Sequence, residues 1–296
     1  MNFSRVNRTA LTGVGAALLA VAAFAVALGS SRSGAASATD GAVGLGEARQ
    51  SSLTLQLPPP VSDHIYGAPS ARGRPIVVID AGHGGRDPGA RSASGEIAEK
   101  DLTLALAKEL RDKLVERGRV RVALTREGDQ YLTLDDRAAL ARRLDAAMFV
   151  SIHVDSAANS LARGASVYSL SDVASDAEAA HLAAEQNAGA AAGEAKGSVD
   201  SILSELAMRS QMSASADLAT RLVKRAAGRF ELRPEPHRFA AFHVLRRAGA
   251  PAVLFEAGYL SNADDEVLLR NPQHRSEIVL ALAQAIEADV AAHARH

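Results

Sequence analysis

The chain has 296 residues, of which 47% are hydrophobic, and a formal net charge of −1 at pH 7. This length allows one large domain or two small ones, and the near-zero charge gives no sign of a nucleic-acid partner. Cysteine is absent, which excludes disulfides, thiolate metal sites and cysteine nucleophiles together.

The N-terminus has the pattern of an export signal. Arg5 and Arg8 precede an apolar run from Ala10 to Gly29, and the small-residue site Ala36-Ser37-Ala38 follows. Residues 1–38 are therefore predicted to be a secretory signal peptide. The apolar run approaches the roughly 20 residues that span a bilayer, so an uncleaved membrane anchor is the alternative. We expect an exported protein, located in the periplasm, that contacts a membrane only if this segment is retained.

A linker is expected to separate this segment from the folded domain. Residues 39–73 include Pro58-Pro59-Pro60 and show little periodicity, which is typical of a flexible linker too short to fold by itself. The domain is predicted to span residues 74–296. It opens with the buried strand Ile76–Ile79, which runs into Asp80-Ala81-Gly82-His83-Gly84-Gly85, where the glycines are expected to leave space beside the histidine.

Strand and helix patterns alternate after this opening. Leucines recur every four residues in a helix that ends at Gly118. A second helix is predicted from Thr133 to Leu144, with the threonine as its N-cap. The other predicted elements of this half are strands at residues 120–125, 147–153 and 165–170.

The second half begins with an alanine-rich helical insert, residues 171–228. Strands are then predicted at residues 241–245 and 252–256, and the spacing of Ile278, Leu282 and Ile286 predicts a closing amphipathic helix. The whole pattern predicts an α/β domain with a largely parallel twisted sheet, helices on both of its faces and the insert near the active site.

Polar residues stand at the ends of three predicted strands: His83, His153 and Glu256. If the strands are parallel, these residues share one edge of the sheet, and Glu99 in the next helix is within reach. Glu96 competes with Glu99 on pattern alone. Two imidazoles and one carboxylate suit zinc, and a water at the fourth position would make the site catalytic. A further carboxylate is then needed to transfer protons.

Each of these residues also has an ordinary structural interpretation. A lone histidine is usually a satisfied core or surface group, and Glu99 could simply favour the helix dipole. Glu256 is harder to explain in this way, because a buried acid after three apolar residues needs a partner or a role. Asp155 could support a ligand from behind or close a turn. His243, on a predicted strand, is a candidate for substrate contact.

These segments resemble the zinc-dependent N-acetylmuramoyl-L-alanine amidases, the bacterial cell-wall amidases that include the cell-separation enzymes. The resemblance runs from about Pro75 to the end of the chain and rests on six segments in the family's order: Val78–Gly85, Asp87–Ala90, Glu99-Lys100, Ser151–Asp155, Leu254–Glu256 and Leu260–Asn262.

The resemblance implies a set of site residues and a reaction. His83, Glu99 and His153 would hold one Zn²⁺ per chain, and Glu99 is chosen over Glu96 because the family's ligand precedes a lysine. Glu256 would be the catalytic acid and base, taking a proton from water and giving it to the departing L-alanine nitrogen. The stem peptide would thereby leave the glycan strand of peptidoglycan, in cell separation or wall turnover.

The resemblance also implies regulation through the insert at residues 171–228. A helix there would block the site until an activator protein moves it, with Glu185 or Glu194 as an additional zinc ligand. The alternatives to this amidase are another zinc hydrolase of the cell wall, such as a peptidase or deacetylase, and a non-enzymatic wall-binding module. In the amidase, Gly84 and Gly85 are expected to make room for a polymeric substrate, so that bulk at Gly85 would harm catalysis before folding.

Overall fold

The computed structural model describes residues 61–188 and 200–293. The predicted signal or anchor, residues 39–60 of the linker, and Glu194 in the insert lie outside these residues. Within the described ranges, no helix combines the length and the apolar character that crossing a membrane requires.

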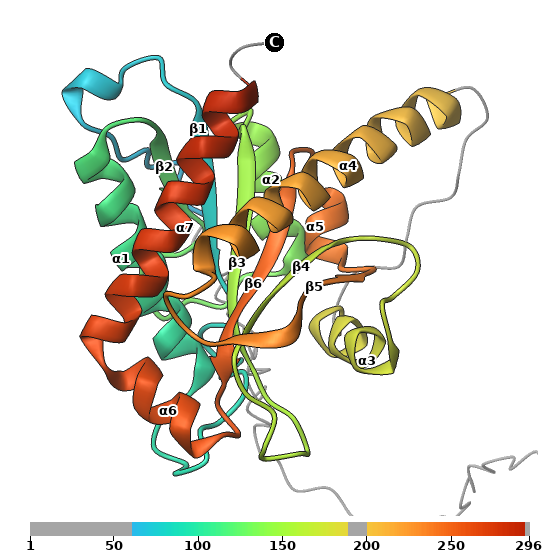
Figure 1. The fold of residues 1–296 in the computed structure, drawn as a ribbon. Helices are drawn as coiled ribbons and strands as arrows, with labels where there is room; N and C mark the ends of the chain where they lie inside the picture. The colour runs from blue at the N-terminus through green and yellow to red at the C-terminus, as the bar shows by residue number, and fades with distance from the viewer. Residues whose placement is uncertain (1–60, 189–199, 294–296) are drawn as a thin grey trace, which may run out of the picture. The chain divides into compact units, whose positions relative to one another are not determined.

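In the described part of the chain, six strands form one sheet in the order β2-β1-β3-β6-β4-β5 (Figure 1). All neighbouring pairs are parallel except β4 with β6. The strands are β1 (Ile76–Ala81), β2 (Arg121–Leu124), β3 (Met148–Asp155), β4 (Ala165–Leu170), β5 (Leu232–Ala240) and β6 (Ala252–Tyr259). The prediction of a largely parallel sheet is confirmed, and β1, β3 and β6 run in the same direction.

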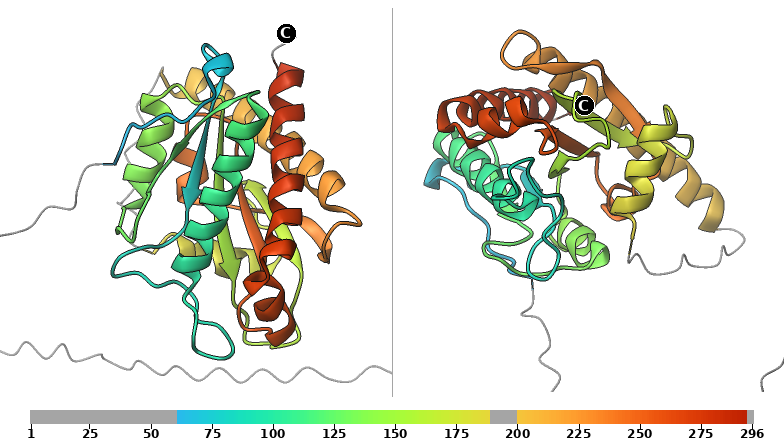
Figure 2. Two further views of the ribbon diagram at one scale, coloured as in Figure 1. Left: turned by 90° about the vertical axis from the view of Figure 1, so that its left-hand side faces the viewer. Right: turned by 90° about the horizontal axis from the view of Figure 1, so that it is seen from below.

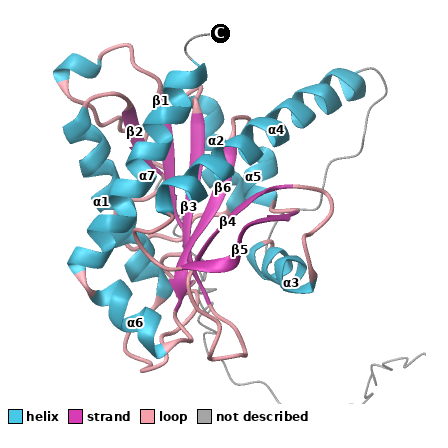
Figure 3. Cartoon of the chain, in the orientation of Figure 1, coloured by secondary structure: helices cyan, strands magenta, loops and turns pink. Residues whose placement is uncertain are grey.

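Helices cover both faces of this sheet, as predicted (Figures 2 and 3). One core contains side chains of α1 (Glu99–Arg117), α4 (Asp200–Ala226) and α7 (Pro272–His293), packed on residues such as Val150. The other contains side chains of α2 (Leu134–Arg143), α3 (Ala177–Gln186) and α5 (His243–Arg247), packed on residues such as Phe149. Alternate residues of β3 therefore enter opposite cores, as the two-residue period of a strand requires. The helix α6 (Ala263–Arg270) follows β6.

Helix ends follow their local signals. The Thr133 hydroxyl accepts the Asp136 backbone N–H, and the Asp136 side chain accepts the Thr133 N–H in return, which makes a capping box at the start of α2. Gly118 ends α1 in the left-handed conformation, with φ 66°. Asn262 caps α6 through two backbone N–H groups. These contacts lie within four residues along the chain, so the sequence alone predicts them.

The strand predicted at residues 241–245 is wrong. Strand β5 lies immediately before it and contains Pro234 and Pro236, which weaken the strand signal because proline cannot donate to a ladder. The prolines are tolerated because β5 is at the edge of the sheet. His243 begins the short helix α5, and its Nε2 lies 3.2 Å from Asp135 Oδ1, so the strand position on which its predicted substrate contact depended is absent.

The chain is already held against the domain before residue 74, the predicted boundary. Tyr66 and Val122 exchange two backbone hydrogen bonds, at 2.7 and 2.9 Å. The guanidinium of Arg111 lies 4.6 Å from the Tyr66 ring centre, and Ala71, in the short 3₁₀ helix Pro69–Ala71, is fully buried. The end of the predicted linker therefore packs on β2 and α1.

Candidate active site

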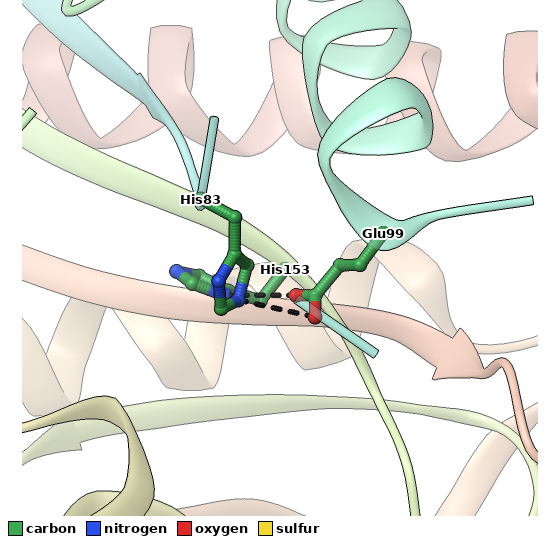
Figure 4. A group of neighbouring side chains, drawn as sticks. All are labelled: His83, Glu99 and His153. Carbon is green, nitrogen blue, oxygen red and sulfur yellow. Dashed lines mark hydrogen bonds and ion pairs between the residues drawn. The ribbon is translucent and has the colours of Figure 1, made fainter. Parts of the chain in front are cut away.

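Three predicted ligands converge at one end of the sheet (Figure 4). His83 follows β1, Glu99 is the first residue of α1, and His153 lies in β3. One ligand atom from each falls within 4.8 Å of the others, and in the described ranges this is the group of three that could hold a metal ion. Glu99 Oε2 lies 3.1 Å from His83 Nε2, and Glu99 Oε1 lies 3.0 Å from His153 Nδ1. The carboxylate of Glu99 therefore lies between the two imidazoles.

The backbone around His83 has a conformation that the rest of the structure must enforce. His83 has φ 57°, which is uncommon for a residue with a side chain. Arg137 holds this turn by donating to the carbonyls of His83 at 2.7 Å and Ala81 at 2.6 Å. At Gly82 a Cβ atom would stand 2.6 Å from His153 Nε2. The position therefore needs glycine, because the imidazole of the second histidine occupies the space of a side chain.

A buried polar network supports this loop from below. Asp80 accepts hydrogen bonds from Arg137 at 2.8 Å and from the hydroxyls of Thr125 and Ser151, both at 2.7 Å. Burial alone would raise the pKa of Asp80, but Arg137 and the two hydroxyls outweigh it and lower that pKa. Arg126 donates to the Ala81, Gly82, Lys100 and Gly128 carbonyls, and burial lowers its pKa to about 10.

Sequence reasoning missed this network. Its one signal was Asp80 itself, an acid directly after four buried apolar residues, which is the same signal that singled out Glu256. Its arginine partners come from β2 and α2 or beside them, and no short-range spacing marks them.

We expect Arg137→Met to destabilise the protein by about 3 kcal/mol, because it leaves the Asp80 charge buried without its main partner. Urea unfolding, fitted with one common m-value for the wild type and the variant, would measure this change in the free energy of unfolding. Arg143→Met is the matched control, since that arginine pairs with Asp63 at the surface, and it should cost less than about 1 kcal/mol. Equal effects of the two substitutions would contradict the structural role of Arg137.

The histidines are oriented for metal binding. Asp87 Oδ2 lies 2.9 Å from His83 Nδ1 and fixes the ring so that Nε2 enters the site. That nitrogen is buried and, although near Glu99, has no partner with hydrogen-bond geometry in the described residues. Burial lowers the pKa of His83, but the charges of Glu99 and Asp87 outweigh it and raise the pKa to about 9.

The donor set fits zinc. Two imidazoles and one carboxylate are ligands that zinc accepts, and three protein ligands leave a position for water. Burial lowers the pKa of His153, which favours the neutral form that binds metal. A metal ion would replace the proton that His83 carries between its two carboxylates. Once that proton is lost, His83 Nε2, which has no hydrogen-bond partner in the described residues, has a lone pair for a metal ion.

Glu256 stands beside this group on the neighbouring strand. It pairs in register with His153 of β3 on one side and Ser166 of β4 on the other. The side chain is fully buried, and neither carboxylate oxygen has a hydrogen-bond partner in the described residues. Burial raises the pKa of Glu256 well above its usual value, and the charges of Asp155 and Glu99 add to this. Such a carboxyl is costly to fold, which is typical of an acid kept for proton transfer.

Asp155 is a charged neighbour of these groups. It is buried, and burial raises its pKa to about 6. Its carboxylate accepts a hydrogen bond from the Ser156 backbone N–H at 2.7 Å. Within the described residues, Asp155 makes no hydrogen bond with His83 or His153. A bulge between β3 and β6 separates the His153 pair from the Asp155 pair, so β6 carries one extra residue at this edge.

The site opens into two cavities that meet at His83 under the end of α3. The larger has a volume of about 1210 Å³ and the smaller about 420 Å³, and both are lined by His83, Asp87, Glu185 and Gln186. Glu185 is exposed, lies 3.4 Å from His181 and does not belong to the ligand group. The predicted ligand Glu185 is thus near the site without joining it.

Helix α3 is fastened at both ends. Near its start, Arg233 of β5 donates to both carboxylate oxygens of Glu178, at 2.7 and 2.9 Å. After its end, the Asn187 side chain bonds the Ala241 carbonyl and the His243 N–H, at 2.8 and 2.7 Å. The first part of the insert is therefore a wall of the cleft.

The expectation about Gly85 is wrong. A Cβ atom there would stand 2.7 Å from the Tyr131 backbone nitrogen, and its φ of +59° disfavours any larger residue. Bulk at Gly85 would therefore strain the fold where the loop meets Tyr131, rather than only block substrate.

Comparisons with known proteins agree with this site. Residues 77–288 match the family model "N-acetylmuramoyl-L-alanine amidase". Over 225 residues the chain is 34% identical to N-acetylmuramoyl-L-alanine amidase AmiA of Escherichia coli K12, covering 74% of this chain and 77% of that protein. AmiA of Salmonella typhimurium is 35% identical over 217 residues, with coverage of 71% and 74%.

A solved structure shares the fold. The catalytic domain of CwlV, an N-acetylmuramoyl-L-alanine amidase from Bacillus (Paenibacillus) polymyxa var. colistinus, matches with a TM-score of 0.55 and 29% identity. The match covers 72% of this chain and 96% of that one. With the matched family model and the AmiA relatives, it leads to one conclusion: the chain belongs to the N-acetylmuramoyl-L-alanine amidase family.

Proposed function

We propose that this amidase uses one zinc ion, held by His83, Glu99 and His153, and Glu256 as its acid and base. The bond cleaved is the amide between N-acetylmuramic acid and L-alanine in peptidoglycan. The observation that supports the proposal most directly is the buried, unpaired Glu256 carboxylate in register with His153. Bound zinc would supply Lewis acidity and make hydroxide available near neutral pH.

The chain's own residues account for the proton transfers. Glu256 takes a proton from the attacking water and returns it to the alanine nitrogen as the amide bond breaks. A carboxyl whose pKa is raised is suited to both steps, because it holds a proton more strongly than an ordinary glutamate and can still return it to the leaving group. Asp87 holds His83 in position throughout, and the Asp80 and Arg137 pair keeps the His83 turn from relaxing.

We propose that the insert limits access to the site and that an activator protein relieves this limit. Glu185 and Gln186 line both cavities, which are the larger and the smaller lobe of one cleft. The end of α3 therefore stands between the two lobes that a polymeric substrate must occupy. Glu185 could reach a bound metal ion only by leaving His181. Glu194 remains the alternative ligand predicted from the sequence.

One experiment tests the function and the insert together. Purified full-length protein and a variant lacking residues 185–193 are analysed for zinc and incubated with sacculi. We expect about one zinc per chain, new L-alanine amino termini without cut peptides or acetate, and faster release by the deletion variant. Cut peptides would indicate a peptidase, and acetate a deacetylase. Equal rates for the two proteins, with both folded, would contradict the inhibitory role of the insert.

We infer from the N-terminal residues that the reaction takes place outside the cytoplasm. Arg5, Arg8 and the apolar run that follows would direct the chain through the membrane to the periplasm. N-terminal sequencing of the protein recovered from cells would separate a signal cleaved after Ala38 from a retained anchor.

A further inference from the structure

The smaller lobe of the cleft contains an arginine that the reaction does not use. Arg86 follows His83 by three residues and lines the same cavity as His83 and His153. The lobe is also lined by the apolar or aromatic residues Tyr131, Leu132, Leu134, Phe242 and Val244, and by the acids Asp80, Asp87 and Glu185. Each of these acids has a basic neighbour: Asp80 pairs with Arg137, Asp87 with His83 and Glu185 with His181. Arg86, an exposed residue, therefore places a cation at the wall of the lobe that begins at the metal ligands.

The Arg86 guanidinium has no anionic partner among the residues that the structure describes. It stacks on the Tyr131 ring, 4.1 Å from the ring centre, which fixes its plane and leaves its N–H edge free. Across residues 61–188 and 200–293 it makes no hydrogen bond or ion pair. The other arginines that line the two lobes are paired: Arg137 with Asp80, Arg163 with Glu231 and Asp264, and Arg233 with Glu178.

The larger lobe is the more acidic of the two, because Asp155, Glu178 and Glu231 line it and do not line the smaller lobe. Its lining carries the acids Asp155, Glu178, Glu185 and Glu231, and its two arginines are neutralised by ion pairs. A carboxylate of the substrate would be repelled there, whereas neutral sugars can hydrogen-bond to carboxylates and amides. Of the two parts of the substrate, the stem peptide carries carboxylates and the glycan is mostly neutral.

We propose that Arg86 binds the carboxylate of the residue that follows L-alanine in the stem peptide. The peptide then lies in the smaller lobe and the glycan strand in the larger one, with the scissile amide at the metal ligands between them. A guanidinium recognises a carboxylate with two parallel hydrogen bonds, which a lysine or an amide cannot reproduce. This inference rests on the amidase function and adds a specificity-determining residue to it.

The test uses two soluble disaccharide-peptides that differ at one group. In one, the residue after L-alanine carries a free α-carboxylate, and in the other it carries a carboxamide. We expect the wild type to prefer the carboxylate by about 10-fold or more in kcat/KM, because a charge-assisted pair is exchanged for a neutral contact. Arg86→Gln should remove this preference through a higher KM for the carboxylate compound, with the carboxamide compound unchanged.

Two controls make the result specific. Arg91→Gln changes an exposed arginine of the same loop that lines neither lobe, and it should keep the wild-type preference. Arg86→Lys should retain only part of the wild-type preference for the carboxylate compound. An equal preference in wild type and Arg86→Gln would contradict the proposal. An equal loss of kcat/KM on both compounds, together with a reduced zinc content, would also contradict it, because that result would indicate a structural role for Arg86.

Binding measured without turnover separates this inference from the amidase function. In the Glu256→Gln background, calorimetry with the same two compounds should give an about 10-fold ratio of Kd that Arg86→Gln abolishes. If the wild type cleaved neither compound while this ratio held, the amidase function would fail and Arg86 would remain a carboxylate site. If cleavage occurred and the ratio were absent, only the role of Arg86 would fail.

Discussion

Glu256→Gln is expected to lower kcat by about 10²–10⁴-fold while the zinc content stays at the wild-type level. General acid–base catalysis contributes a factor of this size, and a glutamine can neither accept the proton of the water nor deliver it to the leaving nitrogen. The amide is nearly the same size as the carboxyl, so the surrounding strands β3 and β4 should keep their pairing. Turnover on sacculi and metal analysis of the same preparation would measure both quantities.

The same substitution, Glu256→Gln, should not lower the stability of the protein, although it lowers kcat. Because the folded-state pKa of Glu256 is raised above its unfolded value of about 4.5, its stabilising contribution is complete below that value. The contribution is lost as the pH rises through the folded pKa. Metal-free Glu256→Gln should therefore be at least as stable as the metal-free wild type at neutral pH, with a weaker loss of stability as the pH rises above about 4.5.

Glu235→Gln is the matched control for this substitution, because Glu235 is exposed on the edge strand β5. We expect wild-type turnover and stability for it. Sacculus hydrolysis by Glu256→Gln at more than a tenth of the wild-type rate, with zinc bound, would show that another group transfers the protons.

Glu99→Ala is expected to weaken zinc binding by at least about 100-fold and to abolish turnover. The carboxylate contacts both histidines and also accepts the backbone N–H groups of Ala90 and Val154, at 2.9 and 3.0 Å. Its removal takes away the one anionic ligand and loosens the loop and strand that carry the other two. Competition with a chromophoric chelator would measure the zinc affinity, and thermal unfolding would report the loosening.

Glu96→Ala distinguishes the two glutamates that the sequence pattern offered. Glu96 lies at the surface, 2.9 Å from Arg270, and an exposed ion pair contributes less than about 1 kcal/mol to stability. Zinc affinity and turnover should stay within two-fold of the wild type. Loss of zinc in Glu96→Ala, with Glu99→Ala unaffected, would reverse the assignment of the ligand.

The sequence predicted most of the helices and most of the strands because their signals are local. Thr133, Gly118 and Asn262 mark helix ends through contacts within four residues, and runs of apolar residues mark β1, β3 and β6. His83, His153 and Glu256 were also accessible from the sequence, since each interrupts or follows a buried run and parallel strands bring their ends to one edge. The role of Glu99 needed the family resemblance, because Glu96 offers the same pattern.

Other features depend on contacts between distant segments, which only the tertiary structure decides. Asp80 is paired with Arg137, 57 residues away, and α3 is tied to β5 through residues 55 apart. Edge strand β5 tolerates two prolines because, in the described part of the chain, it pairs with β4 alone, a condition that depends on strand order. The carboxylates that neutralise Arg163 and Arg233 come from other elements of the chain. Within the described ranges no carboxylate reaches Arg86. The sequence by itself thus determined the fold class and the strand-end ligands through local periodicity, while long-range packing decided how that site is supported and which charges its two lobes present.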